Sequence, residues 1–599
     1  MPALAHGEPA AGAPLHDVVP ATVVALALVA AVAAGVAAHR AGRTAVLTRV
    51  GDVAARAGGV PPWAALPAAV AGVSLLVAVF GFYWDVATHI DYGRDPGPFA
   101  NPSHFLIIGG LVGIALAGVA GIALGCQPTR SSVRLRAGWH APLGAVLLLL
   151  CGGIAVAGFP LDDVWHRLFG QDVTLWSPTH LQMVGGAALS TLALWILVVE
   201  GLRAAAPRDG RVARAAETLV AGAFLIGLSA LQAEFDYSVP QFRLLYHPVL
   251  VAGSAALALV AARVRLGPRG ALGAVATFFA LRGVLTLAIG PGLGHTTLHV
   301  PLYVVEAVAV EIVARWFPTR RPVAFGAVAG AAVGTVGLAA EWAWSHAWMT
   351  IPWPAALLPE GAVVGFVAAV SAGAAGGYVG RALCEPDAAR RRTPAPAAVA
   401  TAGALLVALA YPLPVSGAVD GSAAVTLEPV GGYDRRWVRA TVELRPADLG
   451  RDALWLNVTA WQGGRSVVVP LERAGDAYVA RAPIPVHGEW KALIRLHSGT
   501  SLSAVPLYLP RDDAIPAPEV PARERFARPF VLDERIVLRE AKDVPAALTY
   551  AATGALTVLV AAWVAALVYG LRRLERGVGP PRAARDRIAG AVQSATPQA

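Results

Sequence analysis

Lysine, cysteine and methionine are all scarce in this chain of 599 residues. Lysine occurs only at Lys491 and Lys542, so the net charge of +9 comes from arginine, a bias typical of GC-rich bacterial genomes. The three cysteines show no C-x-x-C spacing, which argues against a disulfide framework and against a thiolate metal site. With only three methionines, the sequence does not support a relay of thioether ligands for Cu(I).

Charged residues are few as well, at 15% of the chain, whereas 56% of the residues are hydrophobic and the mean hydropathy is +0.58. This composition predicts a polytopic α-helical membrane protein. The arginines lie in short loops between apolar runs, so the positive charge does not indicate nucleic-acid binding. Thirteen transmembrane helices are predicted, at 18–39, 63–88, 104–125, 139–161, 179–202, 215–236, 245–265, 270–290, 297–316, 322–344, 358–382, 395–415 and 545–571.

Arginine clusters follow every odd-numbered apolar run, and the positive-inside rule places those ends in the cytoplasm. The N-terminus is then outside, and we expect a multi-pass protein of the plasma (inner) membrane. The predicted organisation is an external tail (1–17), a bundle of twelve helices with repeated hairpin units (18–415), an extracytoplasmic β-domain (416–509), a proline- and charge-rich connector (510–543), a last transmembrane helix (544–571) and a basic cytoplasmic tail (572–599).

Period-2 alternation of apolar and polar residues appears between residues 416 and 509. Short alternating segments separated by Gly, Pro and Asp turns predict an Ig-like or cupredoxin-like β-sandwich on the extracytoplasmic side. The seven predicted strands are 424–427, 437–444, 454–461, 466–471, 477–482, 490–496 and 502–509.

One sequence pattern occurs twice, some 77 residues apart. Each copy has Asp-x3-His at the end of one apolar run, a loop with a further aspartate (Asp95 or Asp172), then Pro-(Ser/Thr)-His and a second apolar run that reaches Gly-Gly. The candidate metal ligands are Asp85, His89 and His104 in the first copy and Asp162, His166 and His180 in the second.

Aspartate and histidine at positions i and i+4 share one face of a helix, and the last histidine of each copy begins the next helix. Each copy therefore brings one carboxylate and two imidazoles to a helix-loop-helix corner at the outer end of the bundle. Such ligands bind Cu, Zn, Fe or Ni, and the affinity order favours copper, with zinc and iron left open. Three protein ligands with a free position suit either catalysis or metal exchange.

Asp85-x3-His89-x14-His104 and Asp162-x3-His166-x13-His180 resemble the two copper-site motifs of the C subunit of particulate methane and ammonia monooxygenases. That family carries Asp-x3-His-x12-His and Asn-x3-His-x13-His. The resemblance covers residues 80–190 and implies copper at both triads. Three departures are Asp162 in place of the family's asparagine, about twice as many spans, and a fused β-domain. In that β-domain, residues 476–490 resemble the end of FixH/YtkA-like periplasmic domains.

Further polar residues lie at the predicted outer corners and inside the spans. Arg282 and Glu306 have matching depths on neighbouring predicted helices, which predicts an intramembrane ion pair. An additional polar site, with solvated loop residues as the alternative interpretation, would comprise Asp236, His247, His295, His299, Glu341, His346 and Glu360.

These features predict a copper-binding integral membrane protein. If it is an enzyme, it is a copper-dependent, monooxygenase-like oxidoreductase. The alternatives are a copper transport or delivery protein, and a proton-coupled transporter without metal. The expected partners are the lipid bilayer, membrane or extracytoplasmic proteins and a second copy of the chain, but no nucleic acid.

Overall fold

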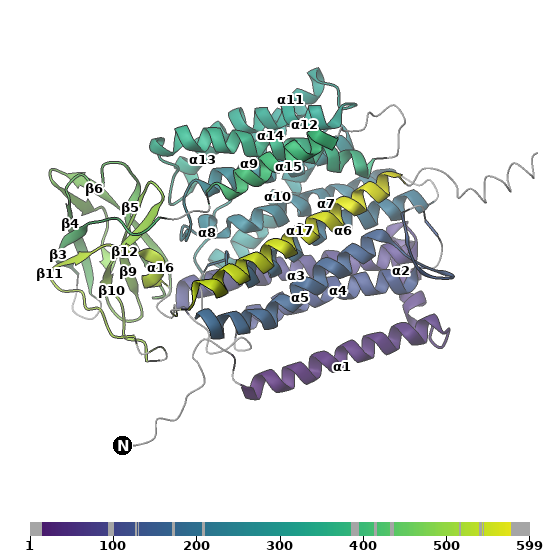
Figure 1. Ribbon diagram of the computed structural model, residues 1–599, viewed down its shortest axis with the longest axis horizontal. Coiled ribbons are helices and arrows are strands. Elements are labelled where there is room, and N and C mark those ends of the chain that lie inside the picture. Colours follow the sequence, from purple (N-terminus) through teal and green to yellow (C-terminus); the bar gives the residue numbers. More distant parts are fainter. Residues whose placement is uncertain are drawn as a thin grey trace, which may run out of the picture.

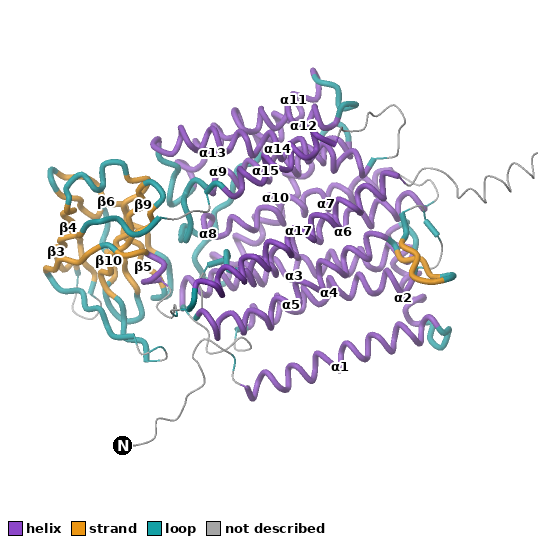
Figure 2. The backbone as a smooth tube through the Cα atoms, in the orientation of Figure 1, coloured by secondary structure: helices purple, strands orange, loops and turns teal. Residues whose placement is uncertain are grey.

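The computed structural model describes residues 13, 15–93, 101–125, 128–129, 131–170, 174–205, 210–384, 395–412, 416–431, 436–513, 515, 517–537, 542 and 544–576. Within this part of the chain, eleven helices are long and apolar enough to cross a membrane. The protein is therefore a multi-pass membrane protein with a domain of antiparallel strands at one end of its helix bundle (Figures 1 and 2).

Most of the predicted spans coincide with long helices. These are α1 (Leu15–Arg40), α3 (Pro62–Tyr92), α4 (Pro102–Leu124), α5 (Leu143–Phe169), α6 (Pro178–Ala204), α7 (Gly210–Ser229) with the short η1 (Ala230–Gln232) and α8 (Ala233–Asp236), α9 (Tyr246–Leu266), α10 (Gly270–Leu287), α12 (Pro322–Ala332) continued by α13 (Leu338–Trp348), α14 (Leu358–Leu383) and α17 (Ala546–Arg576).

Two predicted spans form shorter helices. The span at 297–316 contains α11 (Val304–Trp316), which is preceded by a non-helical segment at 295–303, and the span at 395–415 contains α15 (Ala395–Ala410). The two helices have 13 and 16 residues, whereas the shortest of the eleven long spans has 21, so the number of crossings stays a prediction. An amphipathic helix that the sequence analysis did not anticipate, α2 (Val46–Gly58), follows α1.

The second glycine of each Gly-Gly pair in the repeated pattern lies where two neighbouring helices approach closely. A Cβ atom on Gly110 of α4 would lie 2.6 Å from the Cβ of Ala78 on α3. A Cβ on Gly186 of α6 would lie 2.7 Å from the Cβ of Ala155 on α5. Small residues allow membrane helices to approach closely. The repeat therefore encodes two equivalent helix hairpins, α3–α4 and α5–α6.

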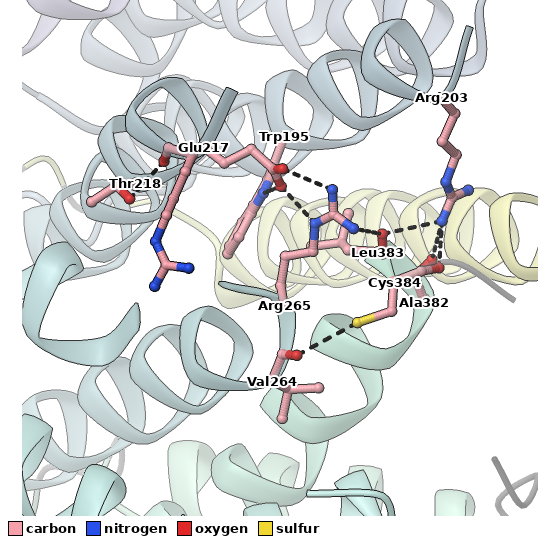
Figure 3. A network of polar contacts seen from close by, with 10 residues as sticks. Trp195, Arg203, Glu217, Thr218, Val264, Arg265, Ala382, Leu383 and Cys384 are labelled. Carbon is pink, nitrogen blue, oxygen red and sulfur yellow. Dashed lines mark hydrogen bonds and ion pairs between the residues drawn. The ribbon is translucent and has the colours of Figure 1, made fainter. Parts of the chain in front are cut away.

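Arginines close the bundle at the end away from the β-domain (Figures 1 and 3). Arg265 on α9 binds both carboxylate oxygens of Glu217, at 2.6 and 2.7 Å, and donates to the Leu383 carbonyl at 2.8 Å. Arg203 on α6 donates to the carbonyls of Leu383 and Cys384. These cations satisfy the last carbonyls of α14, where the helix dipole favours positive charge.

The C-terminal domain is a ten-stranded antiparallel sheet with the path β11-β3-β4-β7-β6-β5-β9-β10-β12, and β8 pairs with β4. All seven predicted strands are present. The strands are β3 (Ser422–Val430), β4 (Trp437–Arg445), β5 (Ala453–Trp461), β6 (Val467–Ala474), β7 (Ala477–Ala480), β8 (Ile484–Pro485), β9 (Lys491–Ser498), β10 (Ser501–Tyr508), β11 (Arg525–Pro529) and β12 (Val531–Leu532).

The domain extends beyond the predicted boundary at residue 509. Strand β11 pairs with β3, and β12 pairs with β10, so part of the predicted connector belongs to the sheet. Alternate residues of β3, β4, β9 and β10, such as Val425, Val442, Ile494 and Val505, share one apolar core. The sheet therefore folds over itself to bury its inner face.

The β-domain is hydrogen-bonded to the outer end of α3. The backbone N–H groups of Gln462 and Gly464, in the β5–β6 turn, donate to the carbonyls of Ile90 and Asp91 at 2.9 and 2.7 Å. Arg495 on β9 donates to the Pro240 carbonyl at 2.6 Å. The domain is thus attached directly to the helix that carries the first repeated pattern.

Acid should destabilise this protein through His497. Its ring is fully buried on β9 against Trp455, and burial, with the charges of Arg243 and Arg495 nearby, lowers its pKa to about 3. In the unfolded chain a histidine binds a proton below about pH 6.5, whereas folded His497 stays neutral down to about pH 3. The unfolded state therefore binds more protons in this window, and stability falls as the pH falls.

The expected loss from His497 is about 2 kcal/mol at pH 5, since one pKa unit corresponds to about 1.36 kcal/mol. Unfolding in denaturant, followed by tryptophan fluorescence between pH 5 and 8, would measure it. His497→Leu should remove this part of the pH dependence. An unchanged slope in the variant would contradict the assignment.

Candidate metal centre

The first candidate centre lies where α3 ends and α4 begins. Asp85 and His89 lie one turn apart near the end of α3, and His104 lies in the first turn of α4. Nε2 of His104 is 3.0 Å from Oδ1 of Asp85, and Nε2 of His89 is 3.6 Å from the same oxygen. All three predicted ligands of the first triad therefore converge.

The second centre has the same construction at the α5–α6 corner. Asp162 and His166 lie near the end of α5, and His180 lies at the start of α6. Nε2 of His180 is 3.4 Å from Oδ1 of Asp162, and Nε2 of His166 is 3.7 Å from Oδ2. The planes of the two imidazole rings make an angle of 78°, with centroids 6.1 Å apart.

These distances fit a tetrahedrally bound metal ion. Bonds of about 2.0–2.1 Å at tetrahedral angles place neighbouring ligand atoms about 3.3 Å apart. The three ligand atoms of each triad lie within 4.8 Å of one another, and all six side chains are partly buried. An ion could thus enter either triad with small side-chain adjustments.

Backbone carbonyls orient one histidine in each triad. Nδ1 of His89 lies 3.0 Å from the Gly93 carbonyl oxygen, and Nδ1 of His180 lies 2.7 Å from the Thr174 carbonyl oxygen. A carbonyl only accepts hydrogen bonds, so each Nδ1 carries the proton and each Nε2 presents its lone pair to the triad. Metal-binding histidines in proteins are held in the same way.

Residues at the helix starts hold the carboxylates. Ser103 Oγ donates to Asp85 Oδ1 at 2.7 Å, and Asn101 Nδ2 donates to the same oxygen at 2.9 Å. Thr179 Oγ1, at the position equivalent to Ser103, donates to Asp162 Oδ1 at 2.6 Å. From sequence alone, Pro-(Ser/Thr) indicates only the start of a helix. Recurrence of a hydroxyl beside the histidine in both copies was the signal for this second role.

Asp91 is a further residue of this region that the sequence analysis missed. It is fully buried, and its Oδ2 lies 3.0 Å from His295 Nδ1 and accepts from the Thr296 N–H at 2.8 Å. Trp84 Nε1 donates to His295 Nε2 at 3.2 Å, so the His295 proton is on Nδ1, facing Asp91. Since Thr296 Oγ1 accepts from the Ser466 N–H at 3.1 Å, this network joins the end of α3 to the β-domain.

The additional acidic residues predicted for this end have separate structural partners. Asp236 pairs with Arg282, and Glu360 pairs with Arg243 at 2.9 Å. Glu341 accepts from two backbone N–H groups at the start of α11. Asp236 and Glu341 are buried, and a buried carboxylate requires such partners. The additional polar site therefore stays a prediction, in which Asp236 and Glu341 interact electrostatically and Glu360 has a separate partner.

The additional histidines are also dispersed. His247 is buried and accepts from Trp353 Nε1 at 3.0 Å, His299 Nδ1 lies 3.2 Å from the Asp236 carbonyl, and exposed His346 bonds to the carbonyl one turn before it on α13. Among the described residues, no group of three metal-ligand side chains outside the two triads lies close enough to hold an ion.

The predicted ion pair between Arg282 and Glu306 is wrong. Nη2 of Arg282 lies 2.5 Å from Oδ2 of Asp236, and both side chains are fully buried. The reason lies in two departures from regular helices. Asp236 is placed inside the bundle by a 3-10 turn, whereas Glu306 lies in the first turn of the short helix α11, next to Glu341.

The loop aspartates of the repeat, Asp95 and Asp172, lie outside the described residues. No family model, curated protein or solved structure matches the chain. The interpretation of the two triads as candidate metal sites thus rests on the repeated sequence and on the geometry described above.

Proposed function

We propose that the protein is a copper-binding membrane protein with one ion at each Asp-His-His triad. The observation that carries the proposal is the repetition. Two corners built from separate parts of the chain place a carboxylate and two imidazole Nε2 atoms within 4.8 Å of one another. Each also holds its carboxylate by a hydroxyl at the same position of the pattern. Helix capping alone does not require that both the cluster of ligand atoms and the hydroxyl contact recur.

Copper is favoured over other ions by the donor set. Imidazole and carboxylate ligands bind the late first-row divalent ions, and Cu²⁺ binds most tightly among them. The resemblance of both triads to the copper motifs of the monooxygenase C subunit supports the same ion. Zinc and iron are the competing ions, and metal analysis separates them from copper.

The triads face the extracytoplasmic side in this proposal, and the membrane is the plasma membrane. Support comes from the arginine clusters that follow the odd-numbered apolar runs, to which Arg203 and Arg265, drawn in Figure 3, belong. Under the positive-inside rule the helix ends that carry them are cytoplasmic. The β-domain, bonded to the triad-bearing end of α3, is then extracytoplasmic.

The reaction class that this site suits is oxidation by a copper-dependent, monooxygenase-like oxidoreductase. Each triad supplies three ligands, which leaves a coordination position for a ligand from solution. Copper delivery is the second candidate, favoured by the attachment of the β-domain to the helix that carries His89. Copper-dependent oxygen consumption with a quinol donor would support the first, and copper movement into vesicles would support the second.

Copper titration of the purified full-length protein tests the proposal. The native chain should bind two equivalents, Asp85→Ala and Asp162→Ala should each bind one, and the double variant should bind none. Asp163→Ala is the matched control, because Asp163 neighbours Asp162 but pairs with Arg167 at 2.7 Å. A double variant that retains two equivalents would contradict copper binding at the triads.

A further inference from the structure

A separate group of titratable side chains lies inside the bundle, apart from the triads. It contains three carboxyl groups and one guanidinium, from Asp236, Glu306, Glu341 and Arg282, each 2% exposed or less. Glu341 lies next to Glu306 and acts electrostatically on Asp236, so the four belong to one cluster. Buried charges in a membrane bundle are costly, so each carboxyl group requires a partner.

Two of the three carboxylates have such partners. Asp236 has the Arg282 guanidinium at 2.5 Å. Glu341 accepts the backbone N–H groups of Leu302 and Tyr303, at 3.0 and 2.7 Å. These donors stabilise an ionised carboxylate at each position.

Among the residues that the structure describes, Glu306 has neither kind of partner. Both of its carboxyl oxygens are buried, and none of these residues donates a hydrogen bond to them. A Cβ atom on Gly337 would lie 2.7 Å from Glu306 Cγ, so the side chain packs directly against the backbone of the neighbouring helix. An ionised carboxylate at this position would be uncompensated, because the cation of the cluster, Arg282, already pairs with Asp236.

Adjacent carboxyl groups in one buried site do not both ionise, because like charges repel strongly where water is excluded. The usual solution is one proton held by the pair. Since Glu341 has the donors and Glu306 has none, the proton belongs on Glu306, whose O–H can then donate to Glu341. The titratable and charged groups around the pair are Asp236 on α8, Arg282 on α10 and Tyr303 at the start of α11.

The backbone around the pair is irregular in the way that ion sites of membrane bundles often are. A π-helical turn, η3 (Val333–Gly337), precedes Glu341, and a second, η2 (Ala288–Gly292), ends α10. The segment 295–303 before Glu306 is not helical. Such π-turns and interrupted helices recur at functional sites in membrane proteins.

We propose that Glu306 and Glu341 form a proton-binding site inside the bundle, with one proton held on Glu306 at neutral pH. The ligand is the proton itself, and the site is independent of copper. It gives the protein a carboxyl pair that can take up or release a proton within the membrane, beneath the end of the bundle that carries the triads.

Infrared spectroscopy of the full-length protein in lipid nanodiscs tests this assignment. The difference spectrum between the native chain and Glu306→Gln, at neutral pH, should show loss of the carbonyl stretching band of one protonated carboxyl group. Glu443→Gln, at an exposed position of β4, should show no such loss. Glu341→Gln should shift the band rather than remove it, because the Glu306 O–H then donates to an amide.

A Glu306→Gln spectrum that loses only a carboxylate band would overturn the proposal. A Glu341→Gln spectrum with an unshifted band of the protonated carboxyl group would overturn it as well. If Glu306→Gln does not fold, Glu341→Gln alone provides the test. The bands should be the same with and without copper. Failure of the copper titration and failure of the proton assignment are therefore distinguishable.

Discussion

Replacement of Arg282 by leucine should destabilise the helix bundle by about 3–5 kcal/mol, the usual cost of removing one partner of a buried ion pair. Asp236 would remain fully buried without its cation. The Arg282 guanidinium also lies 4.1 Å from the centre of the Tyr83 ring, and that cation–π contact would be lost as well. The loss is measurable as reversible unfolding in mixed detergent micelles.

The double variant Arg282→Leu, Asp236→Leu should recover much of this stability, because it leaves no unpaired charge behind. Arg511→Leu is the control. Arg511 pairs with Asp513 on the surface, where both side chains are more than 70% exposed, and such pairs contribute about 0–1 kcal/mol. A double variant as unstable as Arg282→Leu alone would show that the pair does more than clamp the helices.

The sequence predicts most elements of this fold because their signals are local. The alternation of apolar and polar residues over 416–509 predicts seven strands, and all seven are present. The repeated Asp-x3-His and Pro-(Ser/Thr)-His motifs supply the residues of both triads. Each triad is formed by residues no more than twenty positions apart in sequence. Only a helix, a short loop and the start of the next helix are needed to bring them together.

The remaining contacts depend on packing between distant parts of the chain. Arg282 and Asp236 are 46 positions apart, and Asp91 and His295 are 204 positions apart. Hydropathy also predicts a helix over residues 297–303, but α11 begins only at Val304. Glu341 instead accepts hydrogen bonds from the N–H groups of Leu302 and Tyr303. Apolar character alone does not reveal where a buried carboxylate caps a helix start.

Loss of a histidine should weaken copper binding at its own triad and leave the other unchanged. His89→Ala removes a ligand whose Nδ1 is oriented by the Gly93 carbonyl, and His166→Ala removes its counterpart on α5. The affinity loss at that triad should exceed the roughly 10–100-fold typical of a residue that only supports a ligand. Copper affinity by competition with a chelator, with stoichiometry by metal analysis, measures both.

Combinations of these variants test whether the triads are independent. Across triads, the free-energy losses of His89→Ala and His166→Ala should add, as they do for separate sites. Within one triad, His89→Ala and His104→Ala should not add, because a site with two ligands left already binds poorly. His346→Ala is the control, since His346 is exposed on α13 and belongs to neither triad.

A loss of both copper equivalents from His89→Ala alone would contradict two separate sites. It would instead indicate one shared cluster. The structure offers a route for such coupling, because the ring of His104 lies edge-on to Phe159, which is three positions before Asp162 on α5. Phe159→Leu distinguishes the two outcomes. It should leave both equivalents bound if the triads are separate, and weaken both together if the metal ions share one cluster.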